Sequence, residues 1–280
     1  MHWWQALILG LVEGVTEYLP VSSTGHLILT AWLMGLHYEP ARWEAAFAFN
    51  IVIQAGAIAA VLGLYRSRLL RMVRGVLGRD KEGKRLAGHL GLAFLPAALV
   101  GPLLAEPIEA FLNGPWPVVV ALFAGGVLML TVGSSGRLRV QCGRALNDLD
   151  WRMALMIGSS QCVAMWPGTS RSMVTIVVAL LLGLHATAAA EFSFLLGVLT
   201  LGAATVFKAL QDGPAMLAQF GLGPVLLGFV TATVSAGLAV SWLVRFLNRH
   251  GVAPFGWYRL AIAAVFTALL GFQLLTLPVP

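Results

Sequence analysis

Residues 13–26 read Glu-Gly-Val-Thr-Glu-Tyr-Leu-Pro-Val-Ser-Ser-Thr-Gly-His, a polar stretch inside an otherwise apolar run at residues 3–35. A helix needs about 20 apolar residues to cross a bilayer, and each flank of this stretch supplies only about 10–13. Backbone that leaves the helix at membrane depth must be buried in protein or line a water-filled cavity. The stretch therefore predicts a re-entrant helical hairpin over residues 3–35 instead of a spanning helix.

The composition places the whole chain in a membrane. Of its 280 residues, 59% are hydrophobic and 11% are charged, whereas soluble domains carry roughly 25% charged residues. A soluble fold of this length would have too little charge to cover its surface. We therefore expect an all-α polytopic membrane protein with a single membrane domain over residues 1–280.

Six further stretches are long and apolar enough to span a bilayer. They lie at residues 43–65, 86–110, 114–134, 187–209, 221–246 and 256–277. Basic loops are expected at residues 66–85, 134–152 and 245–249, and a short polar turn at residues 211–214. Because positively charged loops remain in the cytoplasm, the three basic loops are placed inside and the polar turn outside.

The formal net charge of +6 does not indicate a nucleic-acid partner. Eight of the 18 Lys and Arg residues lie between Arg66 and Arg85, in one segment flanked by apolar runs. This distribution is typical of a cytoplasmic connection between membrane helices. We therefore expect membrane lipids as partners and no nucleic acid.

A second polar interruption predicts another re-entrant hairpin, at residues 151–183, and its sequence resembles that of the first. Ala-Leu-Ile-Leu-Gly at residues 6–10 matches Ala-Leu-Met-Ile-Gly at residues 154–158. This alignment places Glu13 over Gln161. The two hairpins are therefore interpreted as copies of one unit.

A single-residue gap extends the alignment, so that Pro-Val-Ser-Ser at residues 20–23 lies over Pro-Gly-Thr-Ser at residues 167–170. Each hairpin is followed by three spans, which predicts two repeats, residues 1–135 and residues 150–280. Because three spans separate the copies, the hairpins enter from opposite faces. The fold class is thus an inverted-topology repeat, with six spanning helices, two re-entrant hairpins and polar tips that meet near the midplane.

Glu13 and Glu17 are spaced i, i+4, so both carboxylates share one helix face just before Pro20 ends the helix. An ionisable side chain near the bilayer centre costs roughly 2.5–3.5 kcal/mol, so the two need a compensating partner. One candidate partner is Mg²⁺, which takes one or two carboxylates together with substrate phosphates. The alternative is proton exchange by one carboxyl group in general acid–base catalysis. The pattern leaves both open.

Hydroxyl groups gather where the next half-helix begins. Ser22, Ser23 and Thr24 precede Gly25, and the N–H groups of a helix N-terminus attract anions such as phosphate. Ser23 is expected to be the nucleophile, with His26 or a Glu as its base, although His26 itself is a second candidate nucleophile. Helix capping is the alternative role of Ser22 and Ser23.

The second interruption supplies the complementary charge. Residues 167–175 read Pro-Gly-Thr-Ser-Arg-Ser-Met-Val-Thr. Arg171 can hold phosphate oxygens through two parallel hydrogen bonds. Ser170, Ser172 and Thr175 are expected to donate to the remaining oxygens or to cap the helix. An arginine and hydroxyls that face two carboxylates and a histidine suit phosphoryl transfer; the alternative is a Glu–Arg pair that only locks the two hairpins together.

Both polar tips resemble the signature motifs of the bacterial undecaprenyl-diphosphatase family, of the bacitracin-resistance type. The motifs are residues 13–26 and 167–175, and the resemblance covers essentially the whole chain, including Phe-Asn-Ile-Val-Ile-Gln-Ala-Gly at residues 49–56 and Glu-Phe-Ser-Phe at residues 191–194. One position departs from the family pattern: it is usually acidic, and here it is Asn50. A metal or charge role at that position is therefore in doubt.

The resemblance implies hydrolysis of undecaprenyl pyrophosphate to the monophosphate, which recycles the lipid carrier of peptidoglycan synthesis. It also implies a divalent cation, Mg²⁺ or Ca²⁺, and a pocket that opens to the outer face of the bacterial cytoplasmic membrane. Whether the protein forms a homodimer is left open. By matching positions, the resemblance assigns active-site roles to Glu13, Glu17, Ser23, His26, Ser170, Arg171 and Thr175.

A transporter or lipid flippase is the alternative from a different functional class. Inverted repeats with broken helices are a transporter architecture. A non-catalytic membrane scaffold is a third candidate, but it does not explain the polar tips.

Several isolated polar residues have a simpler interpretation. Gln54 and Gln161 lie in apolar runs and either line the pocket or form interhelical hydrogen bonds. Glu191 is expected near the start of a helix, where it interacts with the helix dipole. Cys142 and Cys162 are too few for a disulfide framework and are expected to be small apolar fillers.

Overall fold

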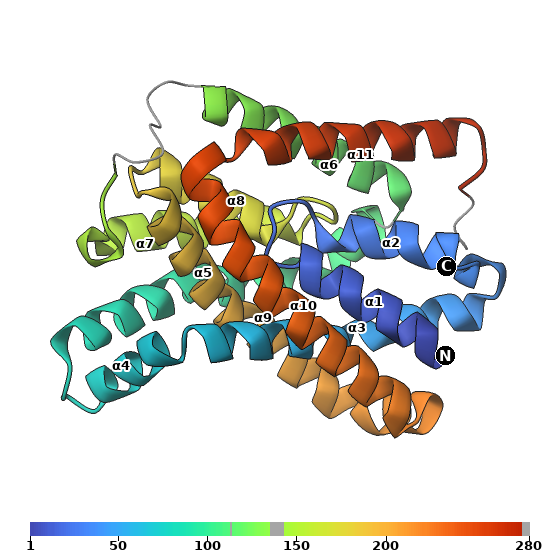
Figure 1. Ribbon diagram of the computed structural model, residues 1–280, viewed down its shortest axis with the longest axis horizontal. Helices are drawn as coiled ribbons and strands as arrows, with labels where there is room; N and C mark the ends of the chain where they lie inside the picture. The colour runs from blue at the N-terminus through green and yellow to red at the C-terminus, as the bar shows by residue number, and fades with distance from the viewer. Residues whose placement is uncertain (113, 135–142, 276–280) are drawn as a thin grey trace.

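The computed structural model describes residues 1–112, 114–134 and 143–275, and the secondary structure of these residues is helical apart from short connections (Figure 1). The first half contains α1 (Trp3–Thr16), α2 (Ser23–Leu33), the short 3₁₀ helix η1 (Leu36–Tyr38), α3 (Pro40–Leu64), α4 (Arg66–Val76), α5 (Lys81–Leu112) and α6 (Pro115–Ser134). The second half contains η2 (Leu146–Asp148), α7 (Trp151–Ser160), η3 (Gln161–Met165), α8 (Arg171–Leu181), α9 (Ala186–Phe220), α10 (Leu222–His250) and α11 (Ala253–Gly271).

Six of these helices are long and apolar enough to cross a membrane, which confirms the six predicted spans. They are α3, α5, α6, α9, α10 and α11. The two interrupted regions form short helices instead, α1 with α2 and α7 with α8, as the polar residues in them predict. We refer to these as the first and the second helix pair. The chain is therefore an all-helical, multi-pass membrane protein.

The prediction of a basic loop at residues 66–85 is wrong, because this segment forms α4 and the start of α5. Arg, Leu and Met favour helix, and the apolar residues of α4 lie on one side. Two glycines let α4 and α5 approach closely: a Cβ on Gly75 would lie 2.0 Å from the Lys84 backbone nitrogen, and one on Gly83 would nearly overlap the α4 backbone. Basic charge here lies on a helical hairpin at one end of the molecule (Figure 1).

Two predicted connections in the second half are also helical. The turn predicted at residues 211–214 lies inside α9, which continues to Phe220 and ends where Gly221 adopts a φ of 74°. Pro214 is a misleading signal because a single proline bends a helix without always ending it. The loop predicted at residues 245–249 forms the last turns of α10, where basic side chains interact favourably with the helix dipole.

Each helix pair packs against a spanning helix of the opposite half. α1 lies along α10, and α7 lies against α5, while α6 and α11 form a pair of their own (Figure 1). Small residues allow the close contact of α1 with α10: a Cβ on Gly14 would lie 2.0 Å from Ser235 Oγ. The largest buried cluster surrounds Tyr18, with Phe192 and Phe194 from α9. The polar end of the first helix pair is therefore held in a rigid apolar surrounding.

Both helix pairs break in the same way. α2 spans Ser23–Leu33 and α8 spans Arg171–Leu181, so both bounds are offset by 148 residues, as positions 23 and 171 show. The residue before each helix is a serine in the left-handed region, Ser22 at a φ of 76° and Ser170 at 71°. The single-residue gap in the predicted alignment is therefore wrong here, because the helix caps set the register and pair Ser22 with Ser170.

Candidate active site

The second motif contacts the first through two neighbouring side chains of α8. Ser172 is fully buried, and its hydroxyl donates to the carbonyl oxygen of Leu19 at 2.9 Å. Arg171 extends to Glu17, with Nη2 3.1 Å from Oε1. The expected contact between Arg171 and a carboxylate of the first motif is therefore present.

Glu17 is the central group of this contact, since each of its carboxylate oxygens has a partner. Oε1 accepts from Arg171, and Oε2 accepts from Ser23 Oγ at 2.7 Å. The side chains of Arg171 and Glu17 are 11% and 8% exposed, so water screens them little. A hydroxyl that donates to a carboxylate can transfer its proton as it attacks an electrophile. The geometry therefore places a proton acceptor, Glu17 Oε2, directly on the Ser23 hydroxyl.

The Arg171 guanidinium is fixed on several sides. Nη1 donates to the carbonyl oxygen of Ser193 at 3.0 Å, and Cζ lies 5.5 Å from the centre of the Tyr18 ring. α9 has a glycine at the contact, and a Cβ on Gly197 would lie 2.2 Å from Nη1. Nε is buried and has no hydrogen-bond partner among the described residues. Arg171 therefore has a fixed orientation, and its Nε is a nitrogen with no partner yet, available to a ligand.

Glu13 is 2% exposed and interacts with the carboxyl group of Glu17. Its Oε2 is buried without a hydrogen-bond partner among the described residues. Two carboxyl groups in contact need a shared proton or a cation. In the part of the chain that the structure describes, no cluster of three His, Cys, Asp or Glu side chains forms a metal cage. The donor set thus fits a cation held jointly by Glu13 and a phosphate, as Mg²⁺ is often held; both oxygens of Glu17 already have partners.

His26 does not contact Ser23 through a hydrogen bond; its two ring nitrogens bind other groups. Nδ1 lies 2.7 Å from the carbonyl oxygen of Ser22, and Nε2 lies 2.7 Å from the hydroxyl of Tyr258. A carbonyl oxygen only accepts, so Nδ1 carries the proton and Nε2 accepts from Tyr258. This arrangement separates His26 from the Ser23 proton and leaves Nε2 as its basic atom.

The hydroxyls predicted to bind phosphate divide into two groups. Ser22 and Ser170 cap their helices by accepting from the backbone N–H groups three residues later. Ser172 also accepts from or donates to Ser170 at 3.0 Å, and Thr175 hydrogen-bonds the carbonyl oxygen of Arg171 and the Ser193 hydroxyl. Thr24 is exposed at the start of α2. The hydroxyls of Ser172 and Thr175 are therefore used in hydrogen bonds to other groups of the protein, whereas Thr24 is exposed.

Tyr258 and Arg259 lie near the site but are not among the site residues predicted from the sequence. Tyr258 hydrogen-bonds His26, and Arg259 is a fully buried arginine that donates to the carbonyl oxygen of Gly168 in the second motif. The signal for Arg259 is present in the sequence, because it is a charged residue in the apolar span 256–277. Nothing in the sequence marks Ser193 in the same way, since a buried serine in a helix often hydrogen-bonds only a backbone carbonyl of its own helix.

Of the isolated polar residues, Gln54 and Gln161 form the interhelical hydrogen bonds that the simpler interpretation predicts, whereas Glu191 has an ion-pair partner that was not predicted and Cys162 is not a buried filler. Gln54 accepts from Thr205 at 3.0 Å, and Gln161 donates to the carbonyl oxygen of Ala93 at 2.9 Å. Glu191 pairs with Arg68 of α4, with 2.6 Å between Oε1 and Nε. Cys162 is a free, partly exposed thiol, and Cys142 lies outside the described residues.

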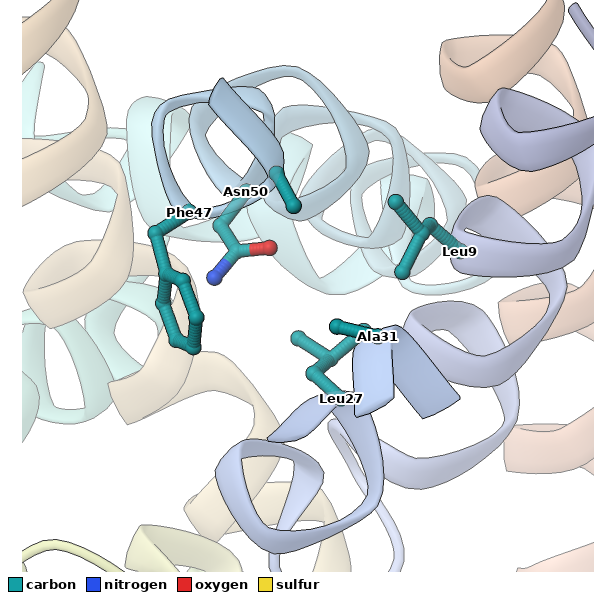
Figure 2. Close-up of a pocket in the computed structure, with 6 residues that line it drawn as sticks. Leu9, Leu27, Ala31, Phe47 and Asn50 are labelled. Atoms are coloured by element: carbon teal, nitrogen blue, oxygen red, sulfur yellow. The ribbon is translucent and has the colours of Figure 1, made fainter. Parts of the chain in front are cut away.

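Figure 2 shows a small hollow between α1, α2 and α3, into which the Asn50 side chain points. It is lined by Leu9, Leu27, Ala31, Ala46, Phe47 and Asn50. The space between these side chains does not admit a water-sized sphere, so the hollow is too small for a phosphate group with its lipid. Asn50 therefore lies apart from the Glu17–Arg171 contact, in apolar surroundings.

The chain is similar to known proteins over most of its length. The sequence profile of the family described as bacitracin resistance protein BacA matches residues 6–265. A relative from Sorangium cellulosum, named undecaprenyl-diphosphatase, is 49% identical over 267 residues, which cover 95% of this chain and 85% of the relative. Proteins of the same name from Pseudomonas aeruginosa and Methylococcus capsulatus are 42% and 43% identical, and the alignments cover 98% and 94% of this chain and 97% and 93% of those proteins.

The family match over residues 6–265 includes both polar motifs, the residues of the Ser23–Glu17–Arg171 contact, and five complete spans with the first part of the sixth. The resemblance that the two motifs predict is therefore confirmed. The chain belongs to the bacitracin resistance protein BacA family.

Proposed function

We propose that this chain hydrolyses undecaprenyl diphosphate to undecaprenyl phosphate and inorganic phosphate, and so recycles the lipid carrier of peptidoglycan synthesis and supports bacitracin resistance. Family membership and the name of its relatives support the reaction. The observation that carries the mechanism is one chain of hydrogen bonds across both motifs. Ser23 donates to Glu17 at 2.7 Å, and Arg171 donates to the other oxygen of Glu17 at 3.1 Å.

In the first step Ser23 Oγ attacks the terminal phosphorus and its proton moves to Glu17 Oε2. The new bond is Oγ–P, and the bond that breaks joins this phosphorus to the bridging oxygen of the diphosphate. Undecaprenyl phosphate leaves with the bridging oxygen. Ser23 is the attacking group rather than His26, because Ser23 Oγ already donates to a base, Glu17 Oε2, at 2.7 Å.

In the second step water attacks the phosphoserine and releases inorganic phosphate. This water needs a base, and Nε2 of His26 is the atom with an available lone pair once water replaces the hydroxyl of Tyr258. The proton of the water moves to Nε2, and the Oγ–P bond breaks as Ser23 regains a proton from Glu17. His26 thus serves the hydrolysis of the intermediate.

Charge neutralisation comes mainly from Arg171 and the two helix N-termini. Nε of Arg171 has no hydrogen-bond partner among the described residues, and α2 and α8 each present N–H groups at their first turns. Thr24, which is exposed beside Ser23, is a further donor to a phosphate oxygen. Oriented donors in a shielded site stabilise developing charge on phosphate more strongly than water does.

A divalent cation, Mg²⁺ or Ca²⁺, would be held by Glu13 together with the phosphate. When bound, such an ion neutralises part of the negative charge of the diphosphate. Glu13 is the residue placed for this, because its Oε2 has no partner among the described residues. Glu17 remains committed to Arg171 and Ser23, although the sequence argument assigns a metal role to both glutamates.

The two halves are proposed to be inverted repeats whose helix pairs are re-entrant, in one membrane domain. The constant offset of 148 residues between Ser23–Leu33 and Arg171–Leu181 supports this, as does the reciprocal packing of α1 on α10 and α7 on α5. With the basic α4 in the cytoplasm of a bacterium, the site opens toward the outer face of the cytoplasmic membrane. The apolar surface around the helix pairs gives the isoprenoid tail lateral access.

The experiment that tests the proposal measures phosphate release from undecaprenyl diphosphate by the full chain in detergent. Release by the wild type and its loss in Arg171→Ala are expected, with loss of about 10³-fold because the guanidinium both orients Glu17 and binds phosphate. Full release by Arg171→Ala would contradict the mechanism. A flippase would instead move undecaprenyl phosphate across sealed vesicles without consuming the diphosphate, and that result with no phosphate release would favour the transporter alternative.

A further inference from the structure

Two adjacent residues of α11 hold one segment of each motif. The hydroxyl of Tyr258 donates to His26 Nε2 at 2.7 Å, and the two rings lie nearly parallel with centroids 5.6 Å apart. Arg259 Nη2 donates to the carbonyl oxygen of Gly168 at 3.0 Å. Although α11 contributes nothing to either motif, it contacts both through neighbouring side chains.

Arg259 has an unusual environment for a charged group. It is 0% exposed, and none of the ion pairs among the described residues includes it. The guanidinium donates instead to the carbonyl oxygens of Ala121, Leu122 and Gly168, while Nη1 has no partner within the described part of the chain. A buried charge without an opposite charge is unfavourable, and an apolar side chain would fill the same space at lower free energy. Arg259 is therefore poorly explained by stability alone.

The chain makes room for this arginine. α6 has a glycine at the contact, and a Cβ on Gly125 would lie 2.5 Å from Arg259 Nη2. Gly168 has a φ of 91° and lies two residues before Ser170, which caps α8. Arg259 thus ties the turn before α8 to the backbone of α6. Arg171 is the first residue of α8, directly after this turn. The position of the turn therefore determines where the Arg171 side chain starts and whether it can contact Glu17.

Tyr258 acts on the other motif by selecting one form of His26. The Ser22 carbonyl oxygen fixes the proton on Nδ1, and the hydroxyl of Tyr258 fixes Nε2 as the acceptor. The ring of His26 is therefore held at both nitrogens in a single orientation. Tyr258 is 44% exposed, so its hydroxyl is able to move away when another donor binds Nε2.

We propose that Tyr258 and Arg259 are positioning residues for the phosphatase reaction. Tyr258 holds His26 with Nε2 ready to accept a proton from the hydrolytic water, and Arg259 fixes the turn from which Arg171 reaches the phosphate. This inference rests on the proposed function, in which His26 serves the second step and Arg171 the binding of phosphate. The two residues therefore affect the kinetic constants in different ways.

The Tyr258→Phe variant tests the first part, since it keeps the ring and removes only the O–H. We expect kcat and KM for undecaprenyl diphosphate to fall together, by about tenfold, with kcat/KM nearly unchanged, because a loosely oriented base slows only the hydrolysis of the phosphoserine. Phosphoserine is expected to accumulate at Ser23, detected by acid quench with a substrate labelled in its terminal phosphate. Tyr38→Phe is the matched control, because Tyr38 is 80% exposed, and it should behave as wild type.

The Arg259→Gln and Arg259→Lys variants test the second part. We expect KM to rise about tenfold in Arg259→Gln, because a displaced Arg171 binds phosphate less well. Arg259→Lys keeps the charge but cannot reach three carbonyl oxygens, so an intermediate KM is expected. Arg245→Gln is the matched control, since Arg245 is exposed and bonds a carbonyl oxygen of its own helix.

The outcomes separate this inference from the proposed function. No phosphate release by the wild type overturns the proposed function itself. An active wild type, with kcat of Tyr258→Phe and KM of both Arg259 variants unchanged, overturns the positioning roles and leaves the reaction standing. If Arg259→Gln does not yield folded protein, the kinetic constants of Arg259→Lys and Tyr258→Phe test the positioning roles instead. A uniform loss of folded protein without these changes in kcat and KM also contradicts the inference, because it indicates a purely structural role.

Discussion

At residues 3–33 and 151–181 the chain forms two helix pairs with the same serine cap and the same left-handed break, yet the two carry opposite chemistry. The first helix pair bears Glu13, Glu17 and Ser23. In the second, the position of Ser23 is taken by Arg171 and that of Glu13 by Gln161. Because the backbone is shared, the functional difference must come from these side chains. One scaffold thus supplies two carboxyl groups and a serine hydroxyl from one side and a guanidinium from the other.

The largest expected effect concerns the nucleophile, which only the first helix pair carries. Ser23→Ala removes the group that attacks phosphorus and should lower kcat at least about 10³-fold, as the loss of other enzymatic nucleophiles does. The measurement is phosphate release under single-turnover conditions. Ser67→Ala, an exposed serine in the basic helical hairpin, should retain wild-type activity. Residual activity of Ser23→Ala near the wild-type level would move the attack to His26.

A smaller effect is expected when the Arg171 guanidinium is kept but moved from its position. In Gly197→Ala the new Cβ would lie 2.2 Å from Arg171 Nη1, so the guanidinium must shift. A shift of this kind lowers the rate by about 10²-fold. Gly202→Ala in the same helix is the control, since nothing lies within 4 Å of its Cβ. Equal activity of the two variants would show that the position of Arg171 does not matter.

Glu13, whose Oε2 has no hydrogen-bond partner among the described residues, predicts a weaker effect that depends on the divalent cation. Glu13→Gln keeps the shape of the side chain but removes the charge that would hold a divalent cation. Activity is expected to fall about tenfold, and more Mg²⁺ should be needed for half-maximal rate. A titration of Mg²⁺ after chelation with EDTA measures this for wild type and variant. An unchanged Mg²⁺ requirement in Glu13→Gln would mean that the cation, if bound, does not use this carboxyl.

The smallest effect is expected at the position that matches Glu13 in the second helix pair. Gln161→Ala removes the hydrogen bond to the carbonyl oxygen of Ala93 and should lower stability by about 0.6 kcal/mol, a typical value for interhelical hydrogen bonds in membranes. Thermal unfolding in detergent would show a small decrease in Tm, and phosphate release should remain within about twofold of wild type. A large loss of activity would mean that both helix pairs carry chemistry at this position.

Much of this architecture follows from the sequence because few alternatives exist in a bilayer. Long apolar runs leave helices as the only spanning structure, and the burial of Glu17 and Arg171 in apolar segments requires that they meet. The pairing of Ser23 with Glu17 instead of His26 was less accessible, since it depends on which face of a short helix each side chain occupies. Glu17 precedes Ser23 by six residues and His26 follows it by three, and neither spacing decides which side chain Ser23 contacts.

Other features cannot be predicted from residue types at all. The partners of Arg259 are carbonyl oxygens, which every residue has, so the sequence does not identify them. The register of the two helix pairs depends on the φ of Ser22 and Ser170, and serine adopts such values rarely. The continuation of α9 past Pro214 has no signal in the sequence, because a proline can bend a helix without ending it.

The distance along the chain between Glu17 and Arg171 has a consequence for biogenesis. The two residues are separated by 154 positions, and ribosomes add about 5–20 residues per second, so the carboxylates wait roughly 8–30 s for their counter-ion. During that time the first half has no basic side chain of the second motif to compensate Glu13 and Glu17 in an apolar environment. Contact of residues 13–26 with water or an insertion factor therefore lowers the free energy of the newly made first half until the second half is synthesised. Assembly of the site is thus coupled to completion of synthesis.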